Sequence, residues 1–398
     1  MRLAFPDGGR TVLTYCTNVH AIEAPADLLD ALFRYCRPVR DRIGTPLLSL
    51  GLWISRRASR ALASEPAERR RLVEALAANG LEIVTLNGFP YGDFHAERVK
   101  EDVYRPDWAD VRRYEYTLEL ATLLEELLPS DIPEGTISTL PLGYVPGGDE
   151  AVVEECALRL AHLAVDLDRL AQRRGRPIRV CLEPEPGCLL ETTPQAIGFF
   201  AEHLRPAARR RGVSDEVLDR HLGLCFDACH QAVAFEDAAA SWEAIAAAGI
   251  VVGKVQLSCA LEASSGSSEL LRPFDEPRFL HQVRRRDARG RIDRWMDLLP
   301  ALESLSAGES EVRVHFHVPL DWRPTGALRT TAGSLADLAG RIAATRPLPH
   351  LEVETYTWTV LPEDIRPRDD ASLIEGIARE LRFAEEALAV HGGARVKV

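Results

Sequence analysis

Nine short apolar segments alternate with longer helical segments along the whole chain, and this alternation constrains the fold more than any other feature of the sequence. The segments cover residues 12–20, 47–55, 81–89, 136–144, 178–185, 222–230, 252–260, 312–320 and 351–358. Each is bounded by glycine, proline or polar residues, as is typical of buried parallel strands. Strands that alternate with helices are joined by right-handed crossovers and form a parallel sheet, either open or closed.

The ends of the strands favour a closed sheet. Polar residues cluster at the C-terminal ends of many different strands, which is where a (β/α)8 TIM barrel carries its chemistry. An open doubly wound sheet needs a glycine-rich phosphate turn after its first strand, but here the first strand leads into Thr17, Asn18, Val19 and His20. We therefore predict an α/β fold, a TIM barrel.

The predicted barrel has eight places for nine candidate strands. One segment must therefore be an accessory strand or part of an insertion, and 136–144 and 312–320 are the two candidates. No linker rich in proline, glycine and serine divides the chain, so we expect residues 1–398 to form a single domain.

Composition narrows the classes of partner. The 48 lysines and arginines are outnumbered by 60 aspartates and glutamates, and the net charge of −12 argues against a nucleic-acid partner. No stretch of eighteen apolar residues is present, so the protein is not expected to be membrane-embedded. The eight cysteines form no CxxC pair and indicate free thiols in a reducing compartment. Because the N-terminus also lacks the pattern of a signal peptide, we expect a cytoplasmic protein.

The fifth candidate strand ends in two acids. Glu183 and Glu185 flank Pro184, and strand alternation puts both carboxylates on one face. Like-charged acids at a strand end are costly without a divalent cation or a proton to share, although both could instead face solvent. Glu191 follows shortly and could reach the same cavity.

Two further segments pair metal-ligating residue types at short spacing. Asp227-x-x-His230 at the exit of a buried strand can put a carboxylate and an imidazole on one opening. His315 and His317 lie two apart, hence on one strand face, although His315 could equally be a core histidine with satisfied hydrogen bonds.

The remaining strand ends add candidates for metal and substrate binding. Of the two acids in the last strand, Glu354 lies nearer the C-terminal end than Glu352 and is therefore the better candidate. The residues that we expect to bind substrate are His20, Asn87, His95 and Gln256.

Together these residues resemble the xylose-isomerase-like barrels, a superfamily of sugar isomerases, epimerases and endonuclease IV. Its members hold a divalent metal with Glu, Asp, His and Glu from successive late strands. The resemblance implies Glu183, Asp227 and Glu354 as metal ligands and His230 as a substrate-binding histidine. Glu191 resembles the second glutamate that some epimerases use.

The third metal ligand departs from the superfamily pattern. The strand after Asp227 offers Gln256 where those enzymes have histidine. The imidazole could come from His317 or His281, or the metal could have been lost. We expect His317 to complete the set.

A closer resemblance extends over nearly the whole chain. The motifs that carry it are TYCTNVH (14–20), NGFPYG (87–92), STLP (138–141), DxCH (227–230), HFHVP (315–319) and LEVETYTW (351–358). They are similar to the EboE family of metabolite traffic proteins, named after a gene cluster implicated in moving a metabolite precursor out of the cytoplasm. This resemblance implies a pathway context, other proteins of that pathway as partners, and a fold compatible with a homo-oligomer.

Three functions follow from these patterns. The first is a metal-dependent isomerase or epimerase that acts on a sugar-like or polyol-like metabolite, with Mn²⁺, Zn²⁺ or Mg²⁺ as cofactor. In it, Glu183, Glu354 or Glu191 would move a proton and His230 would bind substrate. The second is a non-enzymatic metabolite-binding protein of an export pathway, which Gln256 in place of a ligand favours. The third, a nuclease like endonuclease IV, fits poorly with the net charge of −12.

Overall fold

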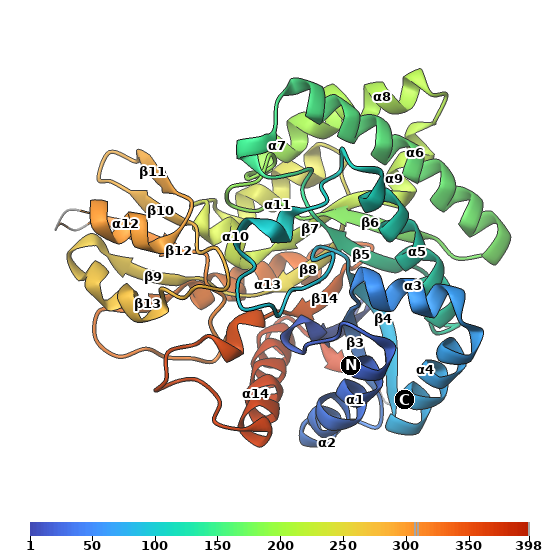
Figure 1. Cartoon of the computed structure of the whole chain (residues 1–398), viewed down its shortest axis with the longest axis horizontal. Coiled ribbons are helices and arrows are strands. Elements are labelled where there is room, and N and C mark those ends of the chain that lie inside the picture. The colour runs from blue at the N-terminus through green and yellow to red at the C-terminus, as the bar shows by residue number, and fades with distance from the viewer. Residues whose placement is uncertain (306–307, 309, 397–398) are drawn as a thin grey trace.

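The computed structural model describes residues 1–305, 308 and 310–396, and eight parallel strands form its centre. They are β2 (Arg10–Tyr15), β3 (Leu48–Trp53), β4 (Leu81–Asn87), β5 (Gly135–Thr139), β6 (Ile178–Leu182), β7 (Leu222–Asp227), β8 (Val252–Leu257) and β14 (His350–Val353). They hydrogen-bond in the order β2-β14-β8-β7-β6-β5-β4-β3. A parallel bridge between Cys16 and Gly51 joins β2 to β3 and closes the ring, which confirms the predicted (β/α)8 TIM barrel (Figure 1).

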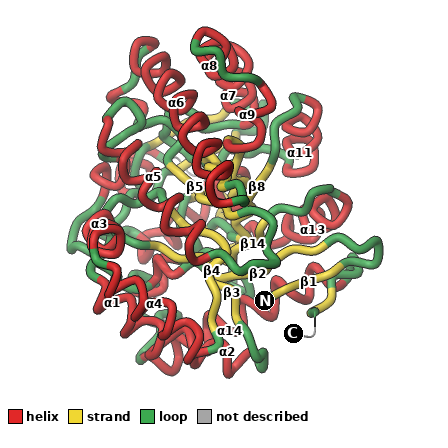
Figure 2. Tube along the Cα trace, turned by 90° about the vertical axis from the view of Figure 1, so that its right-hand side faces the viewer, coloured by secondary structure: helices red, strands yellow, loops and turns green. Residues whose placement is uncertain are grey.

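Helices surround the barrel on the outside, as Figure 2 shows. The α-helices of this layer are α1 (Pro25–Ala31), α2 (Arg37–Ile43), α3 (Arg56–Ser64), α4 (Pro66–Asn79), α5 (Val111–Leu127), α6 (Glu150–Arg174), α7 (Thr193–Gly198), α8 (Arg205–Arg210), α9 (Asp215–His221), α10 (Ala228–Val233), α11 (Ala238–Ala247), α13 (Leu335–Ala344) and α14 (Asp370–Ala389). Short single-turn helices, among them η1 (Thr17–Val19), η3 (Lys100–Tyr104) and η8 (Tyr356–Thr359), follow strand ends at the mouth of the barrel.

The ninth candidate strand belongs to an insertion between β8 and β14. Segment 312–320 begins in β12 (Glu311–Val314), which lies in a separate antiparallel sheet of order β11-β10-β12-β9-β13. Segment 136–144, the other candidate, supplies the barrel strand β5. The other elements of the insertion are β9 (Leu261–Ser264), η6 (Ser265–Phe274), β10 (Val283–Arg286), β11 (Ile292–Trp295), α12 (Leu298–Ser304) and β13 (Arg329–Thr330). In Figure 1 this sheet projects from one side of the barrel.

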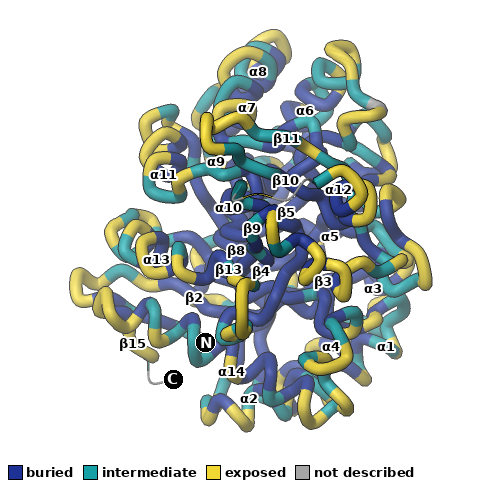
Figure 3. Tube along the Cα trace, turned by 90° about the vertical axis from the view of Figure 1, so that its left-hand side faces the viewer, coloured by how far each residue is buried: buried dark blue, intermediate teal, exposed yellow. Residues whose placement is uncertain are grey.

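The interior of the barrel contains a buried ion pair. Lys254 on β8 and Glu352 on β14 bring Nζ and Oε1 to 2.6 Å, and both side chains are fully buried. Gly51 provides the space for this pair, because a Cβ at position 51 would lie 1.2 Å from Glu352 Oε2. Apolar side chains pack between the strands and the helices, so the strands are the most deeply buried part of the chain (Figure 3).

Two predictions that depend on burial can be compared with the structure. All eight cysteines lie in the described part of the chain, where they are buried and form no disulfide. Among the described residues, none of the helices combines the length and the apolar character that a membrane span requires.

Candidate metal and substrate site

Three acids converge where the C-terminal ends of the barrel strands meet. Glu183 follows β6, Asp227 ends β7, and Glu354 follows β14. Each offers a carboxylate oxygen within 4.8 Å of the other two, and all three side chains are buried. The structure therefore brings together three of the residues that strand-end reasoning selected.

Burial and mutual repulsion make it unfavourable for all three acids of this cluster to be ionised. Burial raises the pKa of Glu183 well above its usual value, and the charges of Glu354 and Asp227 raise it further. Burial likewise raises the pKa of Glu354, with Asp227 and Glu352 adding to the effect. Ionised acids in such a place need a cation to offset their repulsion and lost hydration.

Asp227 is held ready as an ionised group. Burial acts to raise its pKa, but His230, His317 and hydrogen bonds outweigh this effect and the pKa is lowered. Its Oδ1 accepts hydrogen bonds from the His230 amide at 3.0 Å and from Ser258 Oγ at 2.8 Å. The same bond to His230 caps the N-terminus of α10. These contacts fix the carboxylate and leave Oδ2 without a partner.

His317 reaches the acids from the insertion. It lies beyond the end of β12, and its Nδ1 donates a hydrogen bond to the main-chain carbonyl of Glu354 at 2.9 Å. Since Nδ1 carries the proton, Nε2 presents a lone pair, and this buried atom has no partner. Asp227, His230 and His317 each offer a ligand atom within 4.8 Å of the others.

These residues fit a divalent cation. Glu183 Oε2, Asp227 Oδ2 and His317 Nε2 are all buried without a hydrogen-bond partner, although buried polar atoms are normally paired. Two carboxylate oxygens and one imidazole nitrogen, with Glu354 beside them, form a mixed donor set that suits Zn²⁺ or Mn²⁺ better than Mg²⁺.

A hydrogen-bonded network next to this cluster joins residues that the sequence analysis named to others that it did not. His230 Nδ1 donates to the carbonyl of Pro184 at 3.0 Å, and its Nε2 lies 3.1 Å from His315 Nε2. Burial lowers the pKa of His230 to about 4. His315 lines the cavity and is not part of the apolar core.

Glu185 belongs to the same network. It accepts a hydrogen bond from the Tyr104 hydroxyl at 2.7 Å, and burial raises its pKa to about 8. Gln282 joins Tyr104 to His315 through two contacts of 2.7 Å. Strand alternation had placed Glu185 on the same face as Glu183, and that signal was sufficient to select it. Tyr104 and Gln282 come from distant loops and had no such signal.

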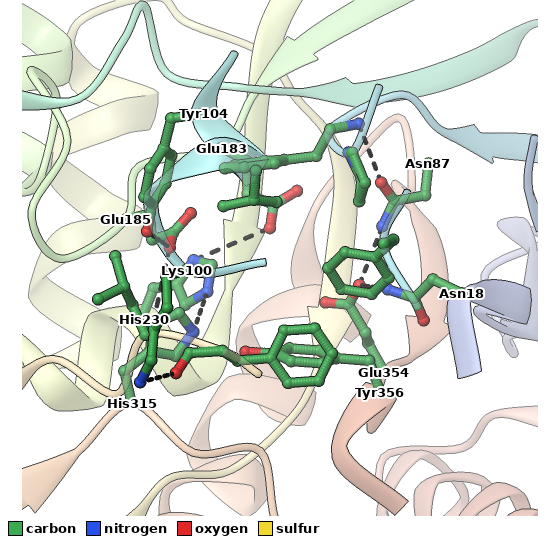
Figure 4. Close-up of a pocket in the computed structure, with 16 residues that line it drawn as sticks. Asn18, Asn87, Lys100, Tyr104, Glu183, Glu185, His230, His315, Glu354 and Tyr356 are labelled. Carbon is green, nitrogen blue, oxygen red and sulfur yellow. Dashed lines mark hydrogen bonds and ion pairs between the residues drawn. The ribbon is translucent and has the colours of Figure 1, made fainter. Parts of the chain in front are cut away.

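Two amides hold Glu354 in place. Asn18 Nδ2 and Asn87 Nδ2 both donate to Glu354 Oε1, at 2.8 Å and 2.9 Å. Asn87 Oδ1 in turn accepts from the amide of Phe89, which fixes the orientation of its side chain. His95 lies one step away, with Nε2 2.8 Å from the carbonyl of Asn18. Asn87 thus lines the cavity, as Figure 4 shows, while His95 supports the loop behind it.

The structure places three other candidates away from the cavity. His20 follows η1 and stacks on Tyr35, with ring centroids 4.3 Å apart. Glu191 accepts a hydrogen bond from Arg284 at 2.8 Å and another from the Gly187 amide at 3.3 Å.

Gln256 does not line the cavity either. It pairs in register with Asp227 inside the sheet, and its Oε1 lies 3.6 Å from Cys225 Sγ. His281, the alternative source of the third imidazole, contacts Glu276 through Nε2 at 2.8 Å. Gln256 Nε2 and His317 Nε2 are both buried without a partner, but an amide nitrogen has no lone pair to give a metal. His317 Nε2 is therefore the candidate for the third ligand, and His317 offers a ligand atom within 4.8 Å of one from Asp227.

Comparison with solved structures identifies the fold. A xylose isomerase-like TIM barrel protein from Mycobacterium smegmatis, in complex with magnesium, aligns over 95% of this chain and 98% of its own, with a TM-score of 0.50 and 12% identity. A putative sugar phosphate isomerase/epimerase from Anabaena variabilis aligns over 96% and 99%, with a TM-score of 0.49 and 11% identity. A xylose isomerase domain protein from Planctomyces limnophilus aligns over 88% and 90%, with a TM-score of 0.47 and 13% identity.

The chain thus has a TIM-barrel fold similar to that of the xylose isomerase-like protein from Mycobacterium smegmatis. At identities this low the likeness shows the fold alone. Neither the family models nor the curated protein sequences compared with the chain give a match.

Proposed function

We propose that the protein binds a divalent metal ion through Glu183, Asp227, His317 and Glu354, and isomerises or epimerises a small sugar-like or polyol-like metabolite. The observation that carries this proposal is the set of three buried, unpartnered ligand atoms, Glu183 Oε2, Asp227 Oδ2 and His317 Nε2. Asp227 connects the other two residues, because it offers a ligand atom within 4.8 Å of one from Glu183 and, in a second group, within 4.8 Å of one from His317. Leaving such atoms unpaired costs about 1–3 kcal/mol each, so burying them around Asp227 favours a ligand that satisfies them.

Each residue has a role in the proposed reaction. A bound divalent ion supplies Lewis acidity to a carbonyl or hydroxyl pair of the substrate. Glu183 and Glu354 flank the position where the substrate carbons would lie, and one of them removes a proton that is returned to the neighbouring carbon or the opposite face. His230 binds a substrate hydroxyl. Glu191 has no role in this scheme, because Arg284 and the Gly187 amide occupy its carboxylate.

The finer context comes from the sequence motifs. The EboE-like motifs at 14–20, 87–92, 227–230 and 351–358 border this cavity, which supports a role in a metabolite-traffic pathway with other proteins of that pathway as partners. The magnesium bound by the Mycobacterium smegmatis protein supports a divalent cofactor here. A homo-oligomer is compatible with this proposal.

One observation favours a second function, that of a non-enzymatic metabolite-binding protein. Gln256 occupies the barrel-strand position where the superfamily pattern has histidine, so the metal set depends on an imidazole from the insertion. A protein that only carries its ligand would keep the cavity and need no proton transfer.

Elemental analysis of the purified full-length chain tests the proposal first. Mass spectrometry for Mn, Fe, Co, Ni, Zn and Mg should find about one metal ion per chain, lost in Asp227→Ala and retained in Glu380→Gln, a buried glutamate outside the cluster. Incubation of the metal-loaded protein with sugars and polyols in D₂O should then incorporate deuterium at carbon, and Glu354→Gln should abolish incorporation. Absence of metal after dialysis against Zn²⁺ and Mn²⁺ contradicts the metal site. Ligand binding without deuterium incorporation supports the carrier function.

A further inference from the structure

The cavity above the acids has two chemically different halves. Its floor is polar and consists of Asn18, Asn87, Glu183, Glu185, His230, His315 and Glu354. The rest of the lining, called the apolar wall below, is mostly made of carbon-rich side chains, chiefly Phe89, Pro90, Phe94, Val103, Phe279 and Tyr356. Figure 4 shows the floor residues and Tyr356 around one space. A ligand in this space meets carboxylates and imidazoles as well as a hydrocarbon surface.

The apolar wall is a packed aromatic cluster. The ring centroids of Phe94 and Phe279 lie 5.0 Å apart, and Phe279 meets Tyr356 edge-on at 5.0 Å. Phe94 and Tyr356 complete the triangle at 5.5 Å. Three rings that brace one another present a fixed surface, which favours contact with a rigid hydrocarbon face.

The wall offers no free positive charge to an anionic group. Lys100 is the only lysine or arginine among the described residues that line the cavity. Its ammonium donates to the carbonyl of Phe279 at 2.7 Å, to Asp297 at 2.7 Å and to the carbonyl of Glu276 at 3.1 Å. An ammonium group has three hydrogens, and all three are used in holding the η3 loop to the insertion.

A bound metal would not reverse the charge of the floor. Glu183, Asp227 and Glu354 are three acids around one small volume, and a dication neutralises only two negative charges. A phosphate or carboxylate on a ligand would be desolvated here beside like charges and without a free cationic partner, which is strongly unfavourable.

We propose that the cavity selects an uncharged, unphosphorylated ring compound, with adjacent hydroxyl or carbonyl oxygens on one edge and a hydrocarbon face. The oxygens meet the acids and histidines of the floor, and the hydrocarbon face packs on Phe94, Phe279 and Tyr356. This inference rests on the proposed function and narrows its substrate from metabolites in general to a class that excludes sugar phosphates.

Fragment probes test this selection. Saturation-transfer NMR on the Zn²⁺-loaded full-length protein would use cis-cyclohexane-1,2-diol, glycerol and glycerol 3-phosphate, which differ in their hydrocarbon face and in charge. We expect the diol to bind most tightly and glycerol 3-phosphate at least about tenfold more weakly than the diol. Equal or tighter binding of glycerol 3-phosphate, or no binding of the diol, overturns the proposal.

A matched pair of variants separates the aromatic wall from general stability. Phe279→Leu keeps an apolar side chain but removes a ring that lines the cavity, and we expect it to weaken diol binding about fivefold. Phe274→Leu removes a buried ring of the same insertion that packs on Phe316 away from the cavity, and it should leave diol binding unchanged. Phe94→Leu provides the same test if Phe279→Leu does not fold. Equal effects of the cavity and control variants contradict the proposal.

Metal content measured on the same samples distinguishes failure of the proposed function from failure of the proposed ligand selectivity. If the protein holds about one metal ion per chain but binds glycerol 3-phosphate and the diol equally tightly, the proposed metal-dependent function stands and the proposed ligand selectivity is contradicted. If the protein holds no metal ion but still prefers the diol, the metal-dependent reaction is contradicted and the proposed ligand selectivity stands.

Discussion

His317 and Glu354 are joined by a hydrogen bond of 2.9 Å from the imidazole Nδ1 to the main-chain carbonyl. Through it, the insertion between β8 and β14 is tied to the residue that follows the last barrel strand. The bond fixes the tautomer and the ring orientation of His317, so that Nε2 faces Asp227. In the proposed metal site, the imidazole ligand would thereby come from the insertion and not from a barrel strand.

Replacing His317 should therefore weaken metal binding. We expect His317→Ala to lower Zn²⁺ affinity by at least about tenfold, because one of four ligand groups is lost while the acids remain. Competition with a chromophoric chelator measures the affinity. His281→Gln is the control, since this imidazole of the same insertion faces Glu276, and its affinity should match that of the wild type. Equal losses of Zn²⁺ affinity in both variants would show that metal binding depends on the folding of the insertion and not on the His317 nitrogen.

The amides on Glu354 lead to a second prediction. Asn87→Ala removes one of the two donors to Glu354 Oε1, and hydrogen bonds to a charged group contribute about 1.5–3 kcal/mol. We expect a tenfold to hundredfold loss in isomerisation kcat, on the order of that energy. Asn79→Ala, which removes a buried amide of α4, should leave the kcat unchanged. A kcat as high as that of the wild type in Asn87→Ala would mean that Asn18 alone positions the carboxylate.

The barrel itself could be predicted because its signals are local. Apolar runs of strand length, separated by helices, mark all eight barrel strands, and each strand leads its polar end residues to the same face. This rule alone predicted that three acids lie close together, because each ends or follows a barrel strand; they are Glu183, Asp227 and Glu354.

The sequence could not show the contacts that join distant parts of the chain. Glu191 was a reasonable candidate until Arg284, 93 residues further along, was found to pair with it. Segment 312–320 was one of the two candidates for the accessory strand, and the structure confirms that it contributes a strand that pairs with β9 and β10 outside the barrel. Nothing local to the segment distinguished it from 136–144. His317 was expected to replace the histidine that the resemblance places at Gln256, and its Nε2 is buried without a partner in the structure. The sequence alone could not show that the insertion brings this residue close to Asp227.

The buried pair of Lys254 and Glu352 should be costly to break from one side. Lys254→Met leaves the Glu352 carboxylate fully buried without its cation, which typically costs about 3–5 kcal/mol of unfolding free energy. The double variant Lys254→Met with Glu352→Gln removes both charges and should be more stable than the single variant. Urea denaturation monitored by circular dichroism gives the three free energies. A single variant as stable as the wild type would contradict a paired, dry interior.

Gly51 should tolerate no side chain. Its Cβ would lie 1.2 Å from Glu352 Oε2, so Gly51→Ala must displace the buried carboxylate or part β2 from β3 at the closure of the barrel. We expect a loss of at least about 3 kcal/mol in unfolding free energy, the range of severe overpacking. Gly198→Ala is the matched control in α7, where a Cβ meets no atom within 4 Å, and there alanine should be neutral or stabilising by up to about 1 kcal/mol. Thermal unfolding of the two variants makes the comparison.

Glu380 on α14 should give the stability of the protein a defined pH dependence. Burial raises its pKa from 4.5 to about 8, and the nearby charge of Asp321 acts in the same direction. Its Oε1 accepts hydrogen bonds from the Leu320 amide at 3.0 Å and the Thr355 hydroxyl at 2.6 Å, which only partly oppose this increase. Between pH 4.5 and 8 the folded chain therefore keeps a proton that the unfolded chain has released. The contribution of Glu380 to stability is consequently full below pH 4.5 and declines as the pH rises toward 8, by up to about 1.4 kcal/mol per pH unit. Glu380→Gln keeps an acceptor oxygen and cannot ionise. The free energy of unfolding of this variant, measured in urea, should therefore rise relative to that of the wild type from pH 5 to pH 8. Parallel stability curves for the two proteins would show that Glu380 does not hold its proton in the folded state.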